Sequence, residues 1–283
     1  MVLSTESPVS NALRRDSNAS VNRALASSCR SGYTRAHGES PGESFFHRLL
    51  WEYLLCGCLC NRSEAEAAAL TDDEEEFISS MRTYMDRPFD PQDPDHNSLF
   101  FSVWRNAFPG SPDPGDTDVQ WTRLGFQSSN PRTDIRTGVH SLEALEYIAR
   151  RYPDEFRKMV TEASNPATEY PFAASCVSIA FSVLIFFKLN TKTAVNASGT
   201  PSGNRLAMKQ FVRLSIMDRN TFDDIVFLVT RRVHREWMSQ PKNRFDIHYF
   251  AVALSTALTA LADAFNKRRI KDSSELFAAL NTS

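Results

Sequence analysis

An uncharged apolar segment, residues 172–187, constrains the fold of this chain more than any other feature. It reads FAASCVSIAFSVLIFF, so its 16 residues include three serines and no charged side chain. A helix that spans a bilayer needs about 20 apolar residues. We therefore expect a core helix that is buried on all sides. Such a helix must be covered by other elements, and the pattern of those elements decides the fold class.

Two long segments on the C-terminal side of this helix have apolar residues spaced three and four apart, which predicts amphipathic helices. No run of alternating strand pattern and no internal repeat is visible in the sequence. The fold class predicted from these patterns is all-α, a compact multi-helix domain. The apolar positions of the two segments are Phe222, Ile225, Val226, Val229, Val233 and Trp237 in one, and Ile247, Ala251, Leu254, Leu258, Leu261 and Phe265 in the other.

Capping residues mark several helix boundaries. Thr71 precedes a run of carboxylates, and this arrangement favours a helix start over an acidic binding patch, because the helix dipole stabilises negative charge in the first turn. We expect a further helix around residues 97–108 and another that is capped by Ser141. Asp272 and Glu275 have the spacing of a capping box that opens a short last helix.

Composition divides the chain into a tail and a domain. Residues 1–43 are rich in Ser and Arg and contain few large apolar side chains. Such a segment cannot bury enough surface to offset its ordering entropy, so we expect a disordered tail, with a transit peptide as the alternative. Residues 44–283 are expected to form one helical domain. The polar stretch at residues 190–204 is expected to be a loop or insertion.

Charge and cysteine content indicate which partners and which cellular compartment to expect. The formal net charge is −2, which gives no indication of nucleic-acid binding. Five cysteines without disulfide spacing, and the lack of a signal peptide, predict a soluble cytoplasmic protein. The cluster Cys56, Cys58 and Cys60 has two interpretations: small apolar residues at a helix end, or palmitoylation sites that attach the protein peripherally to endomembranes.

Motifs for independent chemistry are missing from the sequence. It contains no phosphate-binding loop, GxGxxG, GxSxG or HExxH. The six histidines are dispersed without the spacing of metal ligands. We therefore expect no cofactor and no metal. Whether the chain is an enzyme in its own right stays open, since no independent catalytic site is visible, but a regulator that completes the site of another protein is compatible with these absences.

The densest motif occupies residues 121–136 and reads WTRLGFQSSNPRTDIR. It resembles the signature of the ELMO (engulfment and cell motility) domain, roughly WxxxGFQxxxPxTDFR in the members that activate Arf-family GTPases. Ile135 replaces the Phe of that pattern, and the resemblance extends over about residues 70–265. The residues that match the signature are Trp121, Gly125, Phe126, Gln127, Pro131, Thr133, Asp134 and Arg136.

The resemblance implies a GTPase-activating protein for Arf-family (Arf/Arl) small GTPases. Arg136 would act in trans as an arginine finger, while GTP and Mg²⁺ would be held by the partner GTPase. Gln127 is interpreted as a hydrogen-bonding residue for the loop or the partner rather than as the group that orients water. The supporting residues implied around the arginine are Trp121, Phe126, Pro131 and Leu142 as a rigid base, with Thr133 and Asp134 as ties for the loop.

The sequence departs from the family pattern at one position next to Arg136. Thr137 occupies a position where the family has a Gly-rich turn, so strain in that turn is expected to affect Arg136.

Two alternatives to the arginine-finger interpretation remain. Arg136 could instead brace its own loop from the surface. The alternative function is a non-catalytic ELMO-type adaptor, similar to longer scaffolds that hold exchange factors for Rac-type GTPases. The retained Arg136, and a chain that has no room for a pleckstrin-homology domain or an armadillo array, favour the activator.

Overall fold

The structure is a computed structural model that describes residues 70–190, 205–239, 246–267 and 270–281. The chain divides into two units, Met1–Arg48 and Leu49–Ser283, and every described residue belongs to the second. The predicted tail at residues 1–43, the cluster Cys56–Cys60 and most of the predicted loop at residues 190–204 lie outside the described residues.

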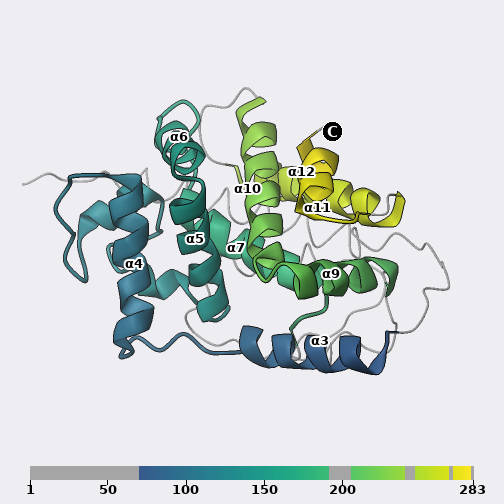
Figure 1. Ribbon diagram of the computed structural model, residues 1–283. Coiled ribbons are helices and arrows are strands. Elements are labelled where there is room, and N and C mark those ends of the chain that lie inside the picture. The colour runs from purple at the N-terminus through teal and green to yellow at the C-terminus, as the bar shows by residue number, and fades with distance from the viewer. Residues whose placement is uncertain (1–69, 191–204, 240–245, 268–269, 282–283) are drawn as a thin grey trace, which may run out of the picture. The chain divides into compact units, whose positions relative to one another are not determined.

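The described part of the chain is helical and contains no strand, which confirms the all-α prediction. Figure 1 shows the helices in order of colour from blue to yellow. The α-helices are α3 (Asp72–Met85), α4 (Pro94–Ala107), α5 (Val139–Arg151), α6 (Pro153–Ala163), α7 (Phe172–Phe186), α9 (Arg205–Met217), α10 (Thr221–Ser239), α11 (Ile247–Lys267) and α12 (Ser273–Asn281). Two short 3-10 helices, η1 (Val119–Leu124) and η2 (Pro131–Asp134), lie between α4 and α5.

Helix α7 is the buried core helix that the apolar segment predicts. Most of its residues are buried, and it packs against α5, α10, α11 and α6. In Figure 1 it lies behind α5 and α10. Because these neighbours cover an uncharged helix with their own apolar faces, the burial of α7 contributes hydrophobic stabilisation to the fold.

One described helix is long and apolar enough to cross a membrane, and it is α11 rather than α7. The stretch Ile247–Phe265 meets that criterion by length and composition, and 44% of it is buried inside the protein. Core helices of soluble proteins meet the same criterion. The buried side of α11 packs mainly against α10, with further contacts to α9 and α12.

Helix starts follow local hydrogen bonding. Thr71 and Glu74 form a reciprocal capping box at α3. The backbone nitrogen of Thr71 donates to the Glu74 carboxylate at 3.0 Å, and the backbone nitrogen of Glu74 donates to the Thr71 hydroxyl at 3.3 Å. Helix α12 begins as expected after Asp272, whose carboxylate accepts from the backbone N–H of Glu275 at 2.9 Å. The prediction of a Ser141 cap is wrong. Helix α5 begins three residues earlier, after Gly138, and Ser141 is buried in its first turn.

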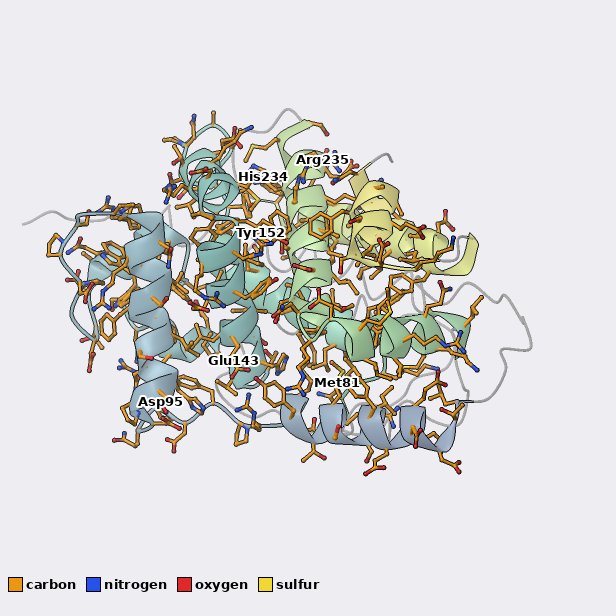
Figure 2. All side chains as sticks on the ribbon, in the orientation of Figure 1. Met81, Asp95, Glu143, Tyr152, His234 and Arg235 are labelled. Atoms are coloured by element: carbon orange, nitrogen blue, oxygen red, sulfur yellow. The ribbon has the colours of Figure 1, made fainter. Side chains whose placement is uncertain are left out.

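Helix α10 brings two aspartates to the side of α5. Asp224 is buried, and its Oδ1 accepts hydrogen bonds from the hydroxyls of Tyr147, at 2.9 Å, and Tyr152, at 2.7 Å. Tyr152, labelled in Figure 2, also stacks on Phe227 with the ring centroids 3.8 Å apart. These contacts fix the relative position of α5 and α10, because a buried carboxylate is stable only where its oxygens have donors.

The neighbouring Asp223 makes stability depend on pH. Burial raises its pKa to about 7, and the nearby Glu143 and Asp224 add to the increase while Arg150 opposes it. An aspartate in the unfolded chain has a pKa near 3.8. The folded state therefore binds the proton more tightly, and the contribution of Asp223 to stability is fully present below about pH 4 and is lost as the pH rises to about 7.

Asp223→Asn replaces the carboxyl group by an amide that carries no charge at any of these pH values. The variant is therefore expected to be more stable than wild type, by an amount that increases as the pH rises. The gain in unfolding free energy should be on the order of 1–3 kcal/mol at pH 8 and clearly smaller at pH 5. Thermal unfolding of wild type and variant, followed by circular dichroism across this range, measures the difference. Parallel pH profiles for the two proteins would contradict the assignment.

Candidate functional site

The motif at residues 121–136 forms two 3-10 turns and a loop between α4 and α5, and aromatic packing anchors its beginning. Trp121 is buried, and its ring makes edge contacts with the rings of Phe100, Trp104 and Phe126 at centroid distances of 5.7 to 6.1 Å. Its indole N–H donates to the carbonyl of Gly115 at 2.8 Å. Aromatic rings packed edge to face in this way are rigid, so η1 provides a fixed base for the following loop.

Gly125 brings the motif into direct contact with the core helix. Its φ of +86° is in the left-handed region that favours glycine. A Cβ at this position would lie 2.2 Å from the backbone nitrogen of Phe172. The carbonyl of Gly125 also accepts from the backbone N–H of Ala174 at 3.2 Å. The start of α7 and the motif are therefore joined backbone to backbone.

Asp134 closes the loop that follows. Its Oδ2 accepts from the backbone N–H of Gln127 at 2.8 Å, which ties the two ends of residues 127–134 together. Burial raises the pKa of Asp134, and the Gln127 hydrogen bond and the positive charge of Arg136 oppose the rise. Within the loop, the Thr133 hydroxyl donates to the carbonyl of Asn130 at 2.8 Å. The side chain of Gln127 is exposed.

Arg136 leaves this loop with an exposed side chain. Its backbone N–H donates to the Asp134 carbonyl at 3.1 Å, and its Nε donates to the Thr133 carbonyl at 2.9 Å. Ile135, which precedes it, is buried. The backbone of Arg136 thus continues directly from the closed loop, and its guanidinium lies at the surface. Pro131 and Leu142, implied as parts of the base, are also buried.

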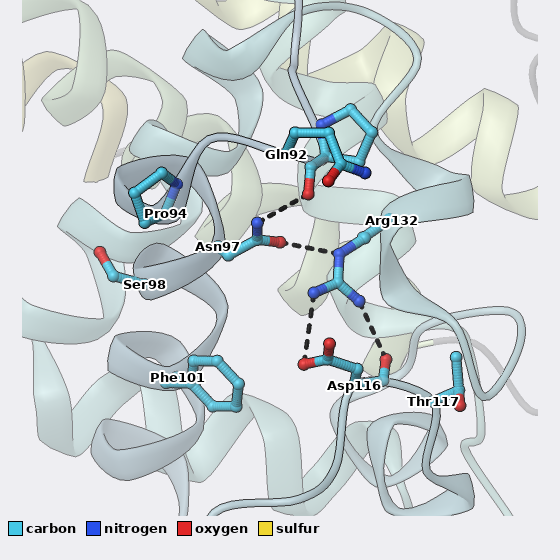
Figure 3. Close-up of a pocket in the computed structure, with 9 residues that line it drawn as sticks. Gln92, Pro94, Asn97, Ser98, Phe101, Asp116, Thr117 and Arg132 are labelled. Carbon is cyan, nitrogen blue, oxygen red and sulfur yellow. Dashed lines mark hydrogen bonds and ion pairs between the residues drawn. The ribbon is translucent and has the colours of Figure 1, made fainter.

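A second arginine of the motif, Arg132, has a structural position that sequence reasoning missed. Figure 3 shows its guanidinium between Asn97 and Asp116. Its Nε donates to the Asn97 side chain at 2.7 Å, its Nη1 donates to the Asp116 carbonyl at 3.2 Å, and its Nη2 lies 3.3 Å from the Asp116 carboxylate. The side chain is 18% exposed. Arg132 therefore joins η2 to α4 and to the loop before η1.

An open pocket of about 720 Å³ lies beside Arg132. It has an apolar side made by prolines and an aromatic ring, while its arginine is already neutralised by the ion pair with Asp116. The arrangement joins three segments and offers no unbalanced charge to a ligand. The lining residues are Pro91, Gln92, Pro94, Asn97, Ser98, Phe101, Asp116, Thr117 and Arg132.

The turn after Arg136 lacks the strain expected at Thr137. In the described part of the chain, Lys188 is the one non-glycine residue with a positive φ. The unusual conformation is taken by Gly138, at φ +112°, where a Cβ would lie 2.9 Å from the Arg87 carbonyl oxygen. Thr137 has an ordinary φ, and its hydroxyl forms a hydrogen bond with the Ser141 hydroxyl.

Thr137→Gly is therefore expected to destabilise the protein rather than to relieve the turn. The variant loses a side-chain hydrogen bond and adds backbone freedom to the unfolded chain, which together cost about 0.5–1.5 kcal/mol. Urea denaturation of the two proteins measures this difference. Equal or higher stability of the glycine variant would show that the threonine is strained after all.

Fold and site together define an all-helical domain with an exposed arginine at the exit of a closed loop. Among the described residues, no group of three or more His, Cys, Asp or Glu side chains is arranged to hold a metal ion. Residues 79–251 match the model of the ELMO/CED-12 family, and the chain belongs to this family.

Similar curated proteins carry the same domain name. ELMO domain-containing protein A of Dictyostelium discoideum is 31% identical over 106 residues, which are 36% of this chain and 11% of that protein. ELMO domain-containing protein 2 of Homo sapiens is 28% identical over 88 residues, which are 31% of this chain and 30% of that protein. The matches thus cover well under two thirds of these relatives. No solved structure matches the chain.

Proposed function

We propose that this protein activates GTP hydrolysis by Arf-family (Arf/Arl) small GTPases, with Arg136 as an arginine finger supplied in trans. Membership of the ELMO/CED-12 family supports a role in small-GTPase regulation in general. The observation that carries the finer proposal is the position of Arg136. It is exposed, and it directly follows a loop that Asp134 closes and that Gly125 joins to the core helix.

The physical requirement for such a residue is a fixed backbone with an accessible guanidinium. Hydrolysis of GTP spreads negative charge over the transferred phosphoryl group, and a planar, permanently charged fork stabilises that charge at two oxygens. A finger is worth about 10³–10⁵ in rate, but only when its geometry is held. The closed loop provides that restraint for the backbone of Arg136.

The remaining components of the reaction come from the partner in this proposal. The GTPase binds GTP and Mg²⁺ and positions the attacking water. The activator then needs no cofactor of its own. It contributes one charged group and the surface that aligns this group with the nucleotide.

A second candidate, a non-catalytic adaptor, is favoured by one specific contact. The Nε of Arg136 donates to the carbonyl of Thr133, three residues earlier in the same loop. An arginine whose role is to brace its own loop would make this bond. In a finger, the same bond would be exchanged for phosphate oxygens when the partner binds.

A panel of purified Arf and Arl GTPases separates the two candidates. Each GTPase is assayed for hydrolysis of bound GTP with and without the full chain, and binding is measured in parallel by pull-down with a non-hydrolysable GTP analogue. Stimulation of at least one member supports the activator. Binding without stimulation across the panel would favour the adaptor and contradict the proposal.

A further inference from the structure

A preorganised side-chain cluster lies where the end of α3 meets the start of α5. Tyr84 is 48% exposed, and the guanidinium carbon of Arg87 lies 3.8 Å from the centre of its ring. One Nη of Arg87 bonds both carboxylate oxygens of Glu143, at 2.7 and 2.9 Å. The hydroxyl of Tyr84 donates to the same carboxylate at 3.1 Å. We call Tyr84, Arg87 and Glu143 the tyrosine cluster.

The tyrosine cluster is connected to the turn that follows Arg136. The carbonyl of Arg87 accepts from the backbone N–H of Val139 at 3.2 Å and approaches Gly138 closely. Gly138 is two residues from Arg136, a separation of at most about 7 Å along the chain. Figure 2 shows Glu143 at the end of α5 that faces α3. The chain segment that carries Tyr84 and Arg87 is therefore bonded, backbone to backbone, to the turn that carries Arg136.

An inserted arginine needs such a neighbouring surface. A specific protein interface buries about 800 Å² on each partner, which is far more than one guanidinium covers. A protein that receives Arg136 must therefore contact the surface around the 136–138 turn. Tyrosine and arginine are among the residue types enriched at the energetic centres of interfaces, and the cluster presents both on the segment that bonds this turn.

Binding at the tyrosine cluster also costs little side-chain conformational entropy. The ring of Tyr84 is restrained by the guanidinium on one face and by the hydrogen bond at its hydroxyl. Little side-chain entropy remains to be lost on association. Arg87 and Glu143 neutralise each other, so the group that the cluster offers to a partner is an aromatic ring.

We propose that the tyrosine cluster is a docking contact for the small GTPase that receives Arg136, with an apolar side chain of the GTPase packed on the ring of Tyr84. This inference rests on the proposed function and assigns a different task to a different residue. Arg136 contributes to the rate of hydrolysis, and Tyr84 contributes to affinity. The two tasks are separable in a titration of the activator against a fixed amount of GTP-loaded GTPase.

Tyr84→Ala is expected to raise the half-saturating activator concentration at least tenfold while the maximal stimulated rate stays within about twofold of wild type. Tyr84→Gln, which keeps a good helix former at this helix end, should show the same loss. Tyr84→Phe retains the ring and should restore affinity to within about threefold. The matched control is Tyr249→Ala, because Tyr249 is 49% exposed but belongs to α11, and it is expected to titrate like wild type.

Two results would overturn the docking contact. If Tyr84→Ala and Tyr84→Gln saturate at the wild-type concentration, the cluster is not a docking contact, while the activator function stands. If wild type stimulates no GTPase, the activator function fails, and binding of GTPases loaded with a non-hydrolysable analogue decides the inference. A loss of binding in Tyr84→Ala but not in Tyr249→Ala then supports it, and an absence of binding by wild type overturns it.

Discussion

Arg136→Lys is expected to reduce stimulated GTP hydrolysis at least about 10²-fold while folding and partner binding remain close to wild type. Lysine retains the positive charge but lacks the planar fork that holds two phosphate oxygens in one geometry. The exposed position of Arg136 explains why folding should be unaffected. Single-turnover hydrolysis at saturating activator measures the change, and the melting temperature checks the fold.

Two other arginines of the same motif serve as controls. Arg123 is exposed, and its guanidinium carbon lies 4.5 Å from the centre of the Phe108 ring, so Arg123→Lys should leave hydrolysis nearly unchanged. Arg132→Lys should instead lower stability, because Arg132 bonds Asn97 and Asp116. Full stimulation by Arg136→Lys on every GTPase that wild type stimulates would remove the arginine-finger mechanism and leave the adaptor.

Gly125→Ala is expected to destabilise the protein strongly. The new Cβ would lie 2.2 Å from the backbone nitrogen of Phe172 and 2.9 Å from the carbonyl carbon of Pro171. Neither atom is the end of a flexible side chain, so the start of α7 or the motif itself must move. The left-handed backbone adds about 1–2 kcal/mol. We expect a total above about 4 kcal/mol, a large part of the stability of a typical domain.

Gly110→Ala is a matched control for this substitution. Gly110 has nearly the same φ, +80° against +86°, but a Cβ there would have no atom within 4 Å. It should therefore show the backbone cost alone, about 1–2 kcal/mol. Thermal unfolding of the three proteins separates the two contributions. Similar melting temperatures for both alanine variants would show that the contact with α7 is not tight.

Much of the fold could be predicted because its signals are local. The uncharged segment at residues 172–187 has few stable environments other than a helical core, and α7 is buried as expected. The capping residues Thr71 and Asp272 act on backbone groups within four residues of themselves, so their helices begin where the sequence indicates. Ser141 has the same chemistry, but Gly138 precedes it with a conformation that starts α5 earlier.

The candidate site could be predicted only in part from the sequence. The pattern of residues 121–136 identifies the family and singles out Arg136, because a motif is a property of residue order. Residue order does not distinguish an arginine that distant segments surround from an arginine that is exposed. Arg132 and Arg136 differ because Asn97 and Asp116, from segments before the motif, surround the first.

The sequence by itself determined the helical class, the family and the position of the motif, since these follow from composition, periodicity and order along the chain. Only the tertiary structure decided that Arg136 is exposed while Arg132 is held by distant segments, why Gly125 cannot carry a side chain, and that the Arg87 carbonyl bonds the turn after Arg136. Each of these depends on contacts between residues far apart in the chain, and such contacts exist only once the helices have packed.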